Sequence, residues 1–127
     1  MKKLLMTLGA VAALGVTASP VWAHHSANSE FDTSKNGEVT GTLTELKDIN
    51  PHSYWSAVIK TADGKSENWE FQGVSPAVLR RQGVRLKDDV KPGDTYTFVY
   101  APAWTNPTLG LLVAIVINGK RYQFITP

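Results

Sequence analysis

The sequence predicts an all-β domain with one short helix, arranged as a small five- to six-stranded barrel of the OB type. Three observations predict it. Apolar and polar residues alternate over several short segments between residues 38 and 125, a helix signal falls between the third and fourth segments, and a glycine interrupts the first. A two-sheet sandwich is the main alternative, but it would have about seven strands and gives no reason for the helix.

The first predicted strand begins at Glu38, and it alternates threonines with Val39, Gly41 and Leu43. A glycine in mid-strand is typical of a bulge or a sharp coil. Asn50-Pro51 ends this segment, because proline lacks an N–H donor and restricts the residue before it. We therefore expect a loop at this point, before the second strand.

The second and third strands form a predicted hairpin. Residues 54–61 place Trp55, Ala57 and Ile59 on one face, and residues 67–72 place Trp69 and Phe71 on one face. Asp63-Gly64 between them is a strong turn signal. These inward aromatic side chains are expected in the core of the barrel.

The helix and the remaining strands follow from local signals. Ser75-Pro76 is a typical helix start, and Arg80-Arg81 lie near the helix end, where positive charge complements the helix dipole. Later segments are expected to form a turn at residues 92–94 and strands at residues 96–100, 109–117 and 122–125.

The first 23 residues have the pattern of an export signal. Lys2-Lys3 precede an apolar stretch over residues 4–16, and Val21-Trp22-Ala23 fits a signal peptidase site. The apolar stretch is shorter than the ~20 residues of a permanent membrane span. We therefore expect residues 1–23 to be a signal peptide, 24–37 an N-terminal arm and 38–127 the barrel of a periplasmic or secreted protein with no stable membrane span once processed.

Charge and composition exclude several functions. Removal of residues 1–23 would leave 104 residues with 11 basic and 11 acidic side chains and no cysteine. A neutral chain argues against nucleic acid, which is bound through clustered cations. The sequence also has no phosphate-binding loop and no nucleophile with a histidine and an acid beside it. We expect a binding protein rather than an enzyme.

The three histidines suggest a copper site. Cleavage after Ala23 would make His24 the first residue, so that its α-amine and ring could chelate one ion, with the ring of His52 as a third nitrogen. His25, Asp32 or water could take a fourth place. Cleavage one residue earlier would make His25 the third residue, another copper-chelating arrangement. The alternative is that His24 and His25 are solvated and His52 stabilises its turn.

Exposed aromatic residues suggest a second interpretation, a module that binds a peptide, a glycan, a small apolar ligand or a periplasmic protein partner. Tyr54 lies on the outer face of its strand and Trp104 in a loop, so both are candidates for a ligand or partner surface. The apolar segment from Trp104 to Leu112 could extend that surface.

An ordered series of short motifs also resembles a family of small exported bacterial proteins of unknown function. The motifs cover nearly all of residues 23–127: Ala23-His24-His25-Ser26, Phe31-Asp32, Gly37 to Leu43, Asn50-Pro51-His52, Asp63-Gly64, Ser75-Pro76, Arg80-Arg81 and Pro92-Gly93-Asp94. The resemblance implies export and a barrel, but it implies no activity and no catalytic residue. The segment from Trp104 to Leu112 is more apolar than the family pattern implies.

Overall fold

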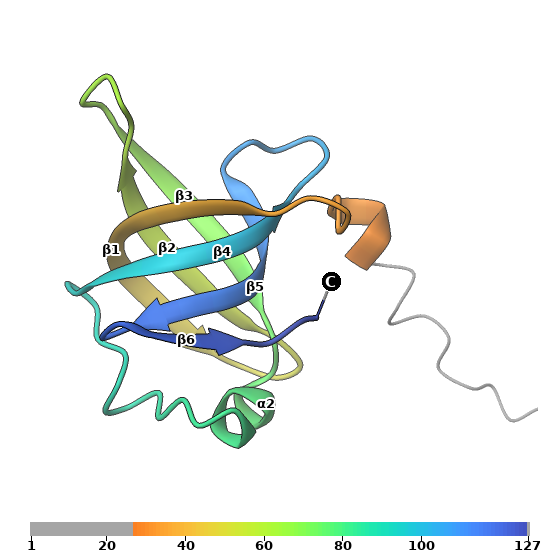
Figure 1. Cartoon of the computed structure of the whole chain (residues 1–127), viewed down its shortest axis with the longest axis vertical. Coiled ribbons are helices and arrows are strands. Elements are labelled where there is room, and N and C mark those ends of the chain that lie inside the picture. Colours follow the sequence, from red (N-terminus) through yellow and green to blue (C-terminus); the bar gives the residue numbers. More distant parts are fainter. Residues whose placement is uncertain (1–26, 127) are drawn as a thin grey trace, which may run out of the picture.

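The computed structural model describes residues 27–126, and it confirms a small β-barrel with one short helix (Figure 1). The predicted signal segment, His24, His25 and the start of the arm lie outside the described residues. The elements are β1 (Gly37–Asp48), β2 (Ser53–Lys60), β3 (Ser66–Gly73), α2 (Pro76–Arg81), β4 (Thr95–Pro102), β5 (Leu109–Ile117) and β6 (Lys120–Gln123).

Five strands close the barrel. Strand β1 pairs antiparallel with both β2 and β4, β3 pairs with β2, and β5 pairs with β4. A short parallel pairing of β3 with β5 completes the circle, and β6 extends the sheet beyond β5. This order, with α2 between β3 and β4, is that of an OB-type barrel, and it excludes two separate packed sheets.

Strand β1 serves both halves of the barrel because it coils. Its first half pairs with β4 and its second half with β2, with Gly41 in both pairings. A Cβ atom at Gly41 would lie 2.5 Å from the carbonyl oxygen of Val58, so only glycine permits this approach. The irregularity expected at the glycine lies just after it, as a register shift between Leu43 and Glu45.

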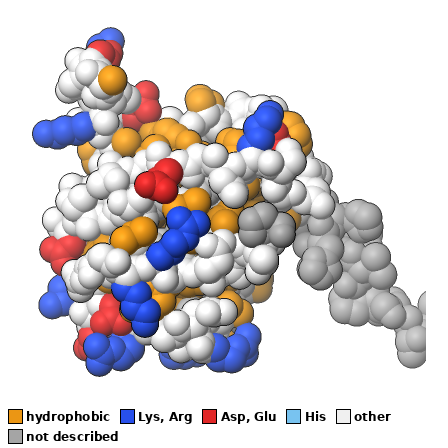
Figure 2. Space-filling view, in the orientation of Figure 1, with side chains coloured by type: hydrophobic (Ala, Val, Ile, Leu, Met, Phe, Trp, Pro, Cys, Tyr) orange, Lys and Arg blue, Asp and Glu red, His pale blue; other side chains and the backbone are white. Residues whose placement is uncertain are grey.

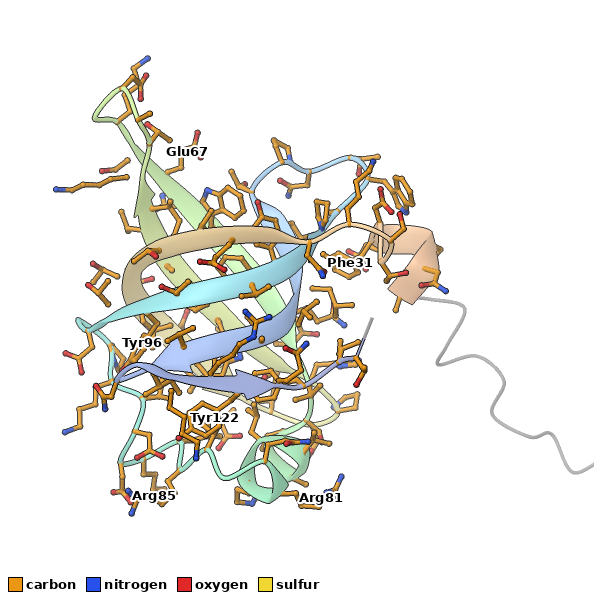
Figure 3. The ribbon with its side chains drawn as sticks, in the orientation of Figure 1. Phe31, Glu67, Arg81, Arg85, Tyr96 and Tyr122 are labelled. Carbon is orange, nitrogen blue, oxygen red and sulfur yellow. The ribbon has the colours of Figure 1, made fainter. Side chains whose placement is uncertain are left out.

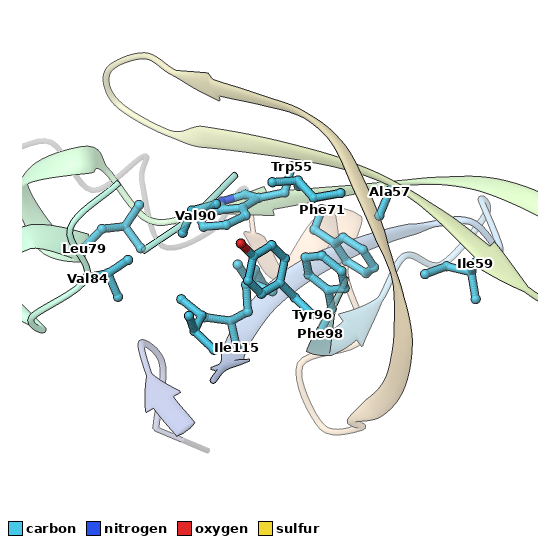
Figure 4. Packing of buried hydrophobic residues seen from close by; sticks show 13 residues of the cluster. Trp55, Ala57, Ile59, Phe71, Leu79, Val84, Val90, Tyr96, Phe98 and Ile115 are labelled. Atoms are coloured by element: carbon cyan, nitrogen blue, oxygen red, sulfur yellow. The ribbon is translucent and has the colours of Figure 1, made fainter. Parts of the chain in front are cut away.

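Aromatic side chains fill the barrel interior (Figure 4). The rings of Phe71 and Phe98 stack with centroids 4.6 Å apart, and Trp55 is fully buried. Leu79 of α2 and Val84 after it are also fully buried and close one end of the barrel. The inward orientation predicted for Trp55 and Phe71 is confirmed.

Local turn chemistry sets the ends of two elements. The Ser75 hydroxyl accepts a hydrogen bond from the Val78 N–H and caps α2, as predicted. Asn118 and Gly119 both have positive φ, which suits a two-residue hairpin turn, so pairing resumes at once with Lys120 opposite Ile117. Strand β6 therefore begins two residues earlier than the segment 122–125 expected from the sequence.

A second, smaller core lies on the outside of β4 and β5. Phe31 is 1% exposed and packs in a cluster with Val99, Ala101, Val113 and Ala114. A β-bridge from Phe31 to Ala103 and a 2.8 Å hydrogen bond from Asp32 N–H to the Pro102 carbonyl hold the arm on the barrel. Phe31 thus anchors the arm, which includes a helical turn at residues 27–30. Within residues 27–126, no helix is long and apolar enough to cross a membrane.

Candidate functional site

His52 ends the β1–β2 loop and is half-buried. The next residue, Ser53, is fully buried, and its hydroxyl donates to the Val74 carbonyl at 2.8 Å and accepts from the Trp55 indole at 2.9 Å. Ser53 is also the first paired residue of β2, opposite Gly73. The backbone that carries His52 is therefore fixed on one side by the core.

Asp32, the proposed carboxylate ligand, already has partners. It accepts hydrogen bonds from the backbone N–H and hydroxyl of Ser34, and it pairs with the Lys35 ammonium at 2.8 Å. The hydrogen bond from Lys35, followed by those from Ser34, lowers the pKa of Asp32 below its usual value. This carboxylate stabilises the turn after Phe31, and its lone pairs are largely engaged there.

The structure brings no complete ligand set together within residues 27–126. No group of three histidine, cysteine, aspartate or glutamate side chains there is placed to hold a metal ion. His52 is the only histidine of this range. The other two histidines of the expected ligand set, His24 and His25, lie outside the described residues.

A polar groove of about 420 Å³ lies on the outer surface of the barrel. It runs between the outer faces of β1, β2 and β3 and the β4–β5 loop, residues 103–108. The residues that line it are mostly hydroxyl and amide side chains: Thr44, Ser56, Ala57, Asn68, Trp69, Glu70, Asn106, Thr108 and Leu109. Such a lining offers both donors and acceptors around one carboxylate.

The β4–β5 loop that forms one wall of the groove is held in place by hydrogen bonds. The Glu70 N–H donates to the Thr108 carbonyl at 3.0 Å, just where β3 meets β5. The side-chain oxygen of Asn106 accepts from both the N–H and the hydroxyl of Thr108 at 3.1 Å. The groove is therefore a preformed feature of the barrel.

The two aromatic residues predicted for a binding surface are close in sequence to residues of the groove but do not line it. Trp104, two residues before Asn106, is 58% exposed, and its indole donates to the Asn28 carbonyl at 3.2 Å. Tyr54 is half-buried and lies two residues before Ser56, in the outer row of β2. The structure thus supports exposure fully for Trp104 and partly for Tyr54.

The apolar segment after Trp104 does not form an exposed surface. Strand β5 begins at Leu109, and Leu112 is fully buried in the barrel core. Leu109 and Leu111 are partly buried and pack against the Phe31 cluster. Their apolar character is explained by burial on both faces of β5, which leaves Trp104 as the exposed large apolar side chain of the segment.

Sequence reasoning missed the groove. Trp69, expected in the core, does pack against it, with its ring stacked 5.8 Å from that of Phe71, but it is only half-buried and also lines the groove. The available signal was the row of small polar residues on the outer faces of β2 and β3. The groove wall depends on the β3–β5 pairing, which local patterns do not predict.

Comparison with known families identifies a family for this chain. A family model described as a family of unknown function (DUF6152) matches residues 11–113, a range that includes His24, His25 and His52. Comparison with curated proteins gives no match.

Proposed function

This chain belongs to DUF6152, a family of unknown function, and we propose that it is an exported, non-enzymatic barrel that binds copper(II) through His24 and His52. The donors are the α-amine and ring of His24, freed by cleavage after Ala23, and the ring of His52. Amine and imidazole nitrogens suit copper(II), and an α-amine with a pKa near 8 is readily deprotonated by the metal.

The observation that carries the proposal is the anchoring of the arm by Phe31. His24 lies seven positions before Phe31. With the turn at residues 27–30 helical and the other residues extended, the arm reaches about 16 Å before side chains are added. The anchor at Phe31 limits how far His24 can move from Phe31, and this raises the effective concentration of His24 near the barrel.

The surface route from Phe31 to His52 is longer than this reach. Strand pairing leads from Phe31 through β4, β5 and β3 to Ser53, in four lateral steps and three residues along β3. At about 5 Å per step and 3.3 Å per residue, these steps add up to about 30 Å, and the diagonal across the curved surface is about 22 Å. The straight line is shorter, and two imidazole side chains bridge part of it. Since the Asp32 carboxylate is engaged, His25 or water is the better fourth ligand.

The test is a copper(II) titration of mature protein that begins at His24. We expect one tight site, and its affinity should fall at least tenfold in either His24→Ala or His52→Ala. His25→Ala keeps the amine and ring of His24 and the ring of His52, so it identifies the fourth ligand: affinity should fall if His25 is that ligand and stay unchanged if water is. Equal affinity in the wild type, His24→Ala and His52→Ala would disprove the proposal.

A second control concerns the amine. A protein that retains three or more residues before His24 still carries all three imidazoles, but it lacks the free amine at His24 and places neither His24 nor His25 third in the chain. It should bind copper(II) more weakly than the mature form, because a chelate of two donors on one residue has been replaced by a single ring nitrogen. Unchanged affinity would show that the amine is not a ligand.

The groove supports a second candidate function, the binding of a hydroxyl-rich ligand such as a neutral glycan. Its supporting observation is the lining of hydroxyl and amide groups between Trp69 and the β4–β5 loop. Titration with an N-acetylglucosamine oligosaccharide, followed by tryptophan fluorescence, tests it. Binding that is lost in Asn68→Ala and retained in His24→Ala would support this function, and the absence of saturable binding in the wild type would overturn it for this probe.

A further inference from the structure

Cations gather at the α2 end of the barrel. Six of the 11 basic residues in the range 27–126 lie in α2, in the loop after it and at Lys120, the first residue of β6, and all six are exposed. We refer to them as the basal patch: Arg80, Arg81, Arg85, Lys87, Lys91 and Lys120. The barrel as a whole has no net charge, so an excess of positive charge at this end is balanced by an excess of negative charge elsewhere on the surface.

The structure places these segments together. Figure 2 shows Lys and Arg side chains along the edge of the molecule where Figure 3 places Arg81 and Arg85. Lys120 lies over the ring of Tyr122, 4.8 Å from its centroid, and a Cβ atom at Gly83 would contact the same ring. Tyr122 of β6 therefore joins Lys120 to the loop that follows α2.

Most of these cations are not neutralised by the protein. Arg85 pairs with Asp89 at 3.1 Å and with Asp88 at 3.8 Å. Within residues 27–126 the other five cations of the basal patch make no ion pair. Their field is therefore directed outward, and it is available to an anionic surface.

A large apolar side chain is exposed beside the basal patch. Ile49 is 52% exposed, and it follows Asp48, which lines a hollow of about 240 Å³ together with Arg80, Arg85, Leu86, Lys87 and Asp88. An exposed isoleucine next to exposed cations is the pattern of a surface that meets both lipid phosphates and the edge of the acyl region.

The hollow itself is a poor site for one small anion. A phosphate between Arg80, Arg85 and Lys87 would also face the carboxylates of Asp48 and Asp88, which line the same hollow. Binding to an anionic lipid surface requires only the summed electrostatic field of the basal patch. Nucleic acid or an acidic protein would also respond to that field, but neither gives a role to Ile49.

We propose that the basal patch docks the barrel on an anionic membrane surface, with the six cations near lipid phosphates and Ile49 inserted at the interface. The site is independent of the copper proposal, because it uses neither His24 nor His52. Docking of this kind is reversible and weakens with salt, since exposed charges are screened.

Sedimentation with vesicles tests the proposal. The full mature protein is mixed with vesicles of phosphatidylglycerol and phosphatidylcholine in equal parts, or of phosphatidylcholine alone. We expect binding to the anionic vesicles that decreases as salt is raised, and little binding to the neutral ones. Equal binding to both compositions, or none to either, would overturn the proposal.

Two matched variants locate the surface. One variant combines Arg80→Glu with Arg81→Glu. The control combines Lys60→Glu with Lys65→Glu, which changes the net charge by the same amount. Lys60 and Lys65 belong to the β2–β3 hairpin, at the opposite end of the barrel (Figure 1). Each cation removed should weaken binding to the anionic vesicles roughly fivefold. The first variant should therefore lower the partition coefficient by at least tenfold, and the control variant should lower it by much less. Similar losses in both would show an effect of net charge alone.

Ile49→Ser separates a membrane from other polyanions. It should weaken binding to anionic vesicles several-fold without changing the urea midpoint, since the side chain is exposed. A DNA duplex and polyglutamate are the competing probes. The protein could bind one of these polymers as strongly as it binds the vesicles, with Ile49→Ser weakening neither the polymer binding nor the vesicle binding. In that case the basal patch is a site for that polymer and the membrane proposal is wrong.

Discussion

Phe31→Ala tests whether the arm is part of the cooperative fold. Phe31 is 1% exposed and packs on Val99, Ala101 and Val113 outside the barrel. Truncation of a buried phenylalanine typically destabilises a protein by about 3–5 kcal/mol. Because the arm lies on an outer face and water can enter when it lifts, we expect the lower end, about 3 kcal/mol. The backbone hydrogen bonds that follow Phe31 should weaken with it.

Urea unfolding measures this change. For a domain of this size the denaturant slope is about 1–1.5 kcal/mol per molar urea, so the midpoint should fall by about 2–3 M. The control is Ile49→Ala, which truncates an exposed side chain and should shift the free energy of unfolding by less than about 0.5 kcal/mol. A loss below about 1 kcal/mol in Phe31→Ala would show that the arm does not belong to the folded unit, and the copper proposal would lose its anchor.

Three further substitutions test the packing and the turn. Ser53→Ala should lower the free energy of unfolding by about 1–3 kcal/mol in urea titrations. The Ser53 hydroxyl accepts a hydrogen bond from the buried Trp55 indole N–H, and the substitution leaves that N–H without a partner. Gly41→Ala should destabilise by at least about 1–3 kcal/mol, because its Cβ would meet the Val58 carbonyl, and an unchanged midpoint would contradict the close approach. The lowered pKa of Asp32 means that its pairing with Lys35 stabilises the fold above pH 3.8 and is lost as the pH falls through the folded pKa below that value. Asp32→Asn should therefore lower the midpoint at pH 7 and flatten its decline in acid.

The fold was predictable where the signals are local. The alternation of Trp55, Ala57 and Ile59, the turn at Asp63-Gly64 and the cap at Ser75 each act within a few residues of sequence. Together with the order of the elements, they were enough to predict the barrel. The start of β6 was placed too late, because the positive-φ pair before it turns the chain within two residues.

The candidate sites were less predictable because they depend on contacts between distant segments. The groove needs the parallel β3–β5 pairing that brings Thr108 to Glu70, and no periodicity in either strand encodes that pairing. The basal patch needs β6 to lie beside the loop after α2, so Lys120 could not be grouped with Arg85 from the sequence. The anchor at Phe31 is the simpler case, because a lone aromatic residue in a polar arm has a local signature in the sequence.

The meeting of the arm and the β1–β2 loop at one copper ion can be observed directly. Nuclear magnetic resonance spectra of ¹⁵N-labelled mature protein, recorded with less than one equivalent of copper(II), report which amides lie close to the paramagnetic ion. We expect selective loss of the amide signals of residues 52–54 together with those of the first residues of the arm. Broadening confined to the arm, with the signals on both sides of His52 unchanged, would contradict it.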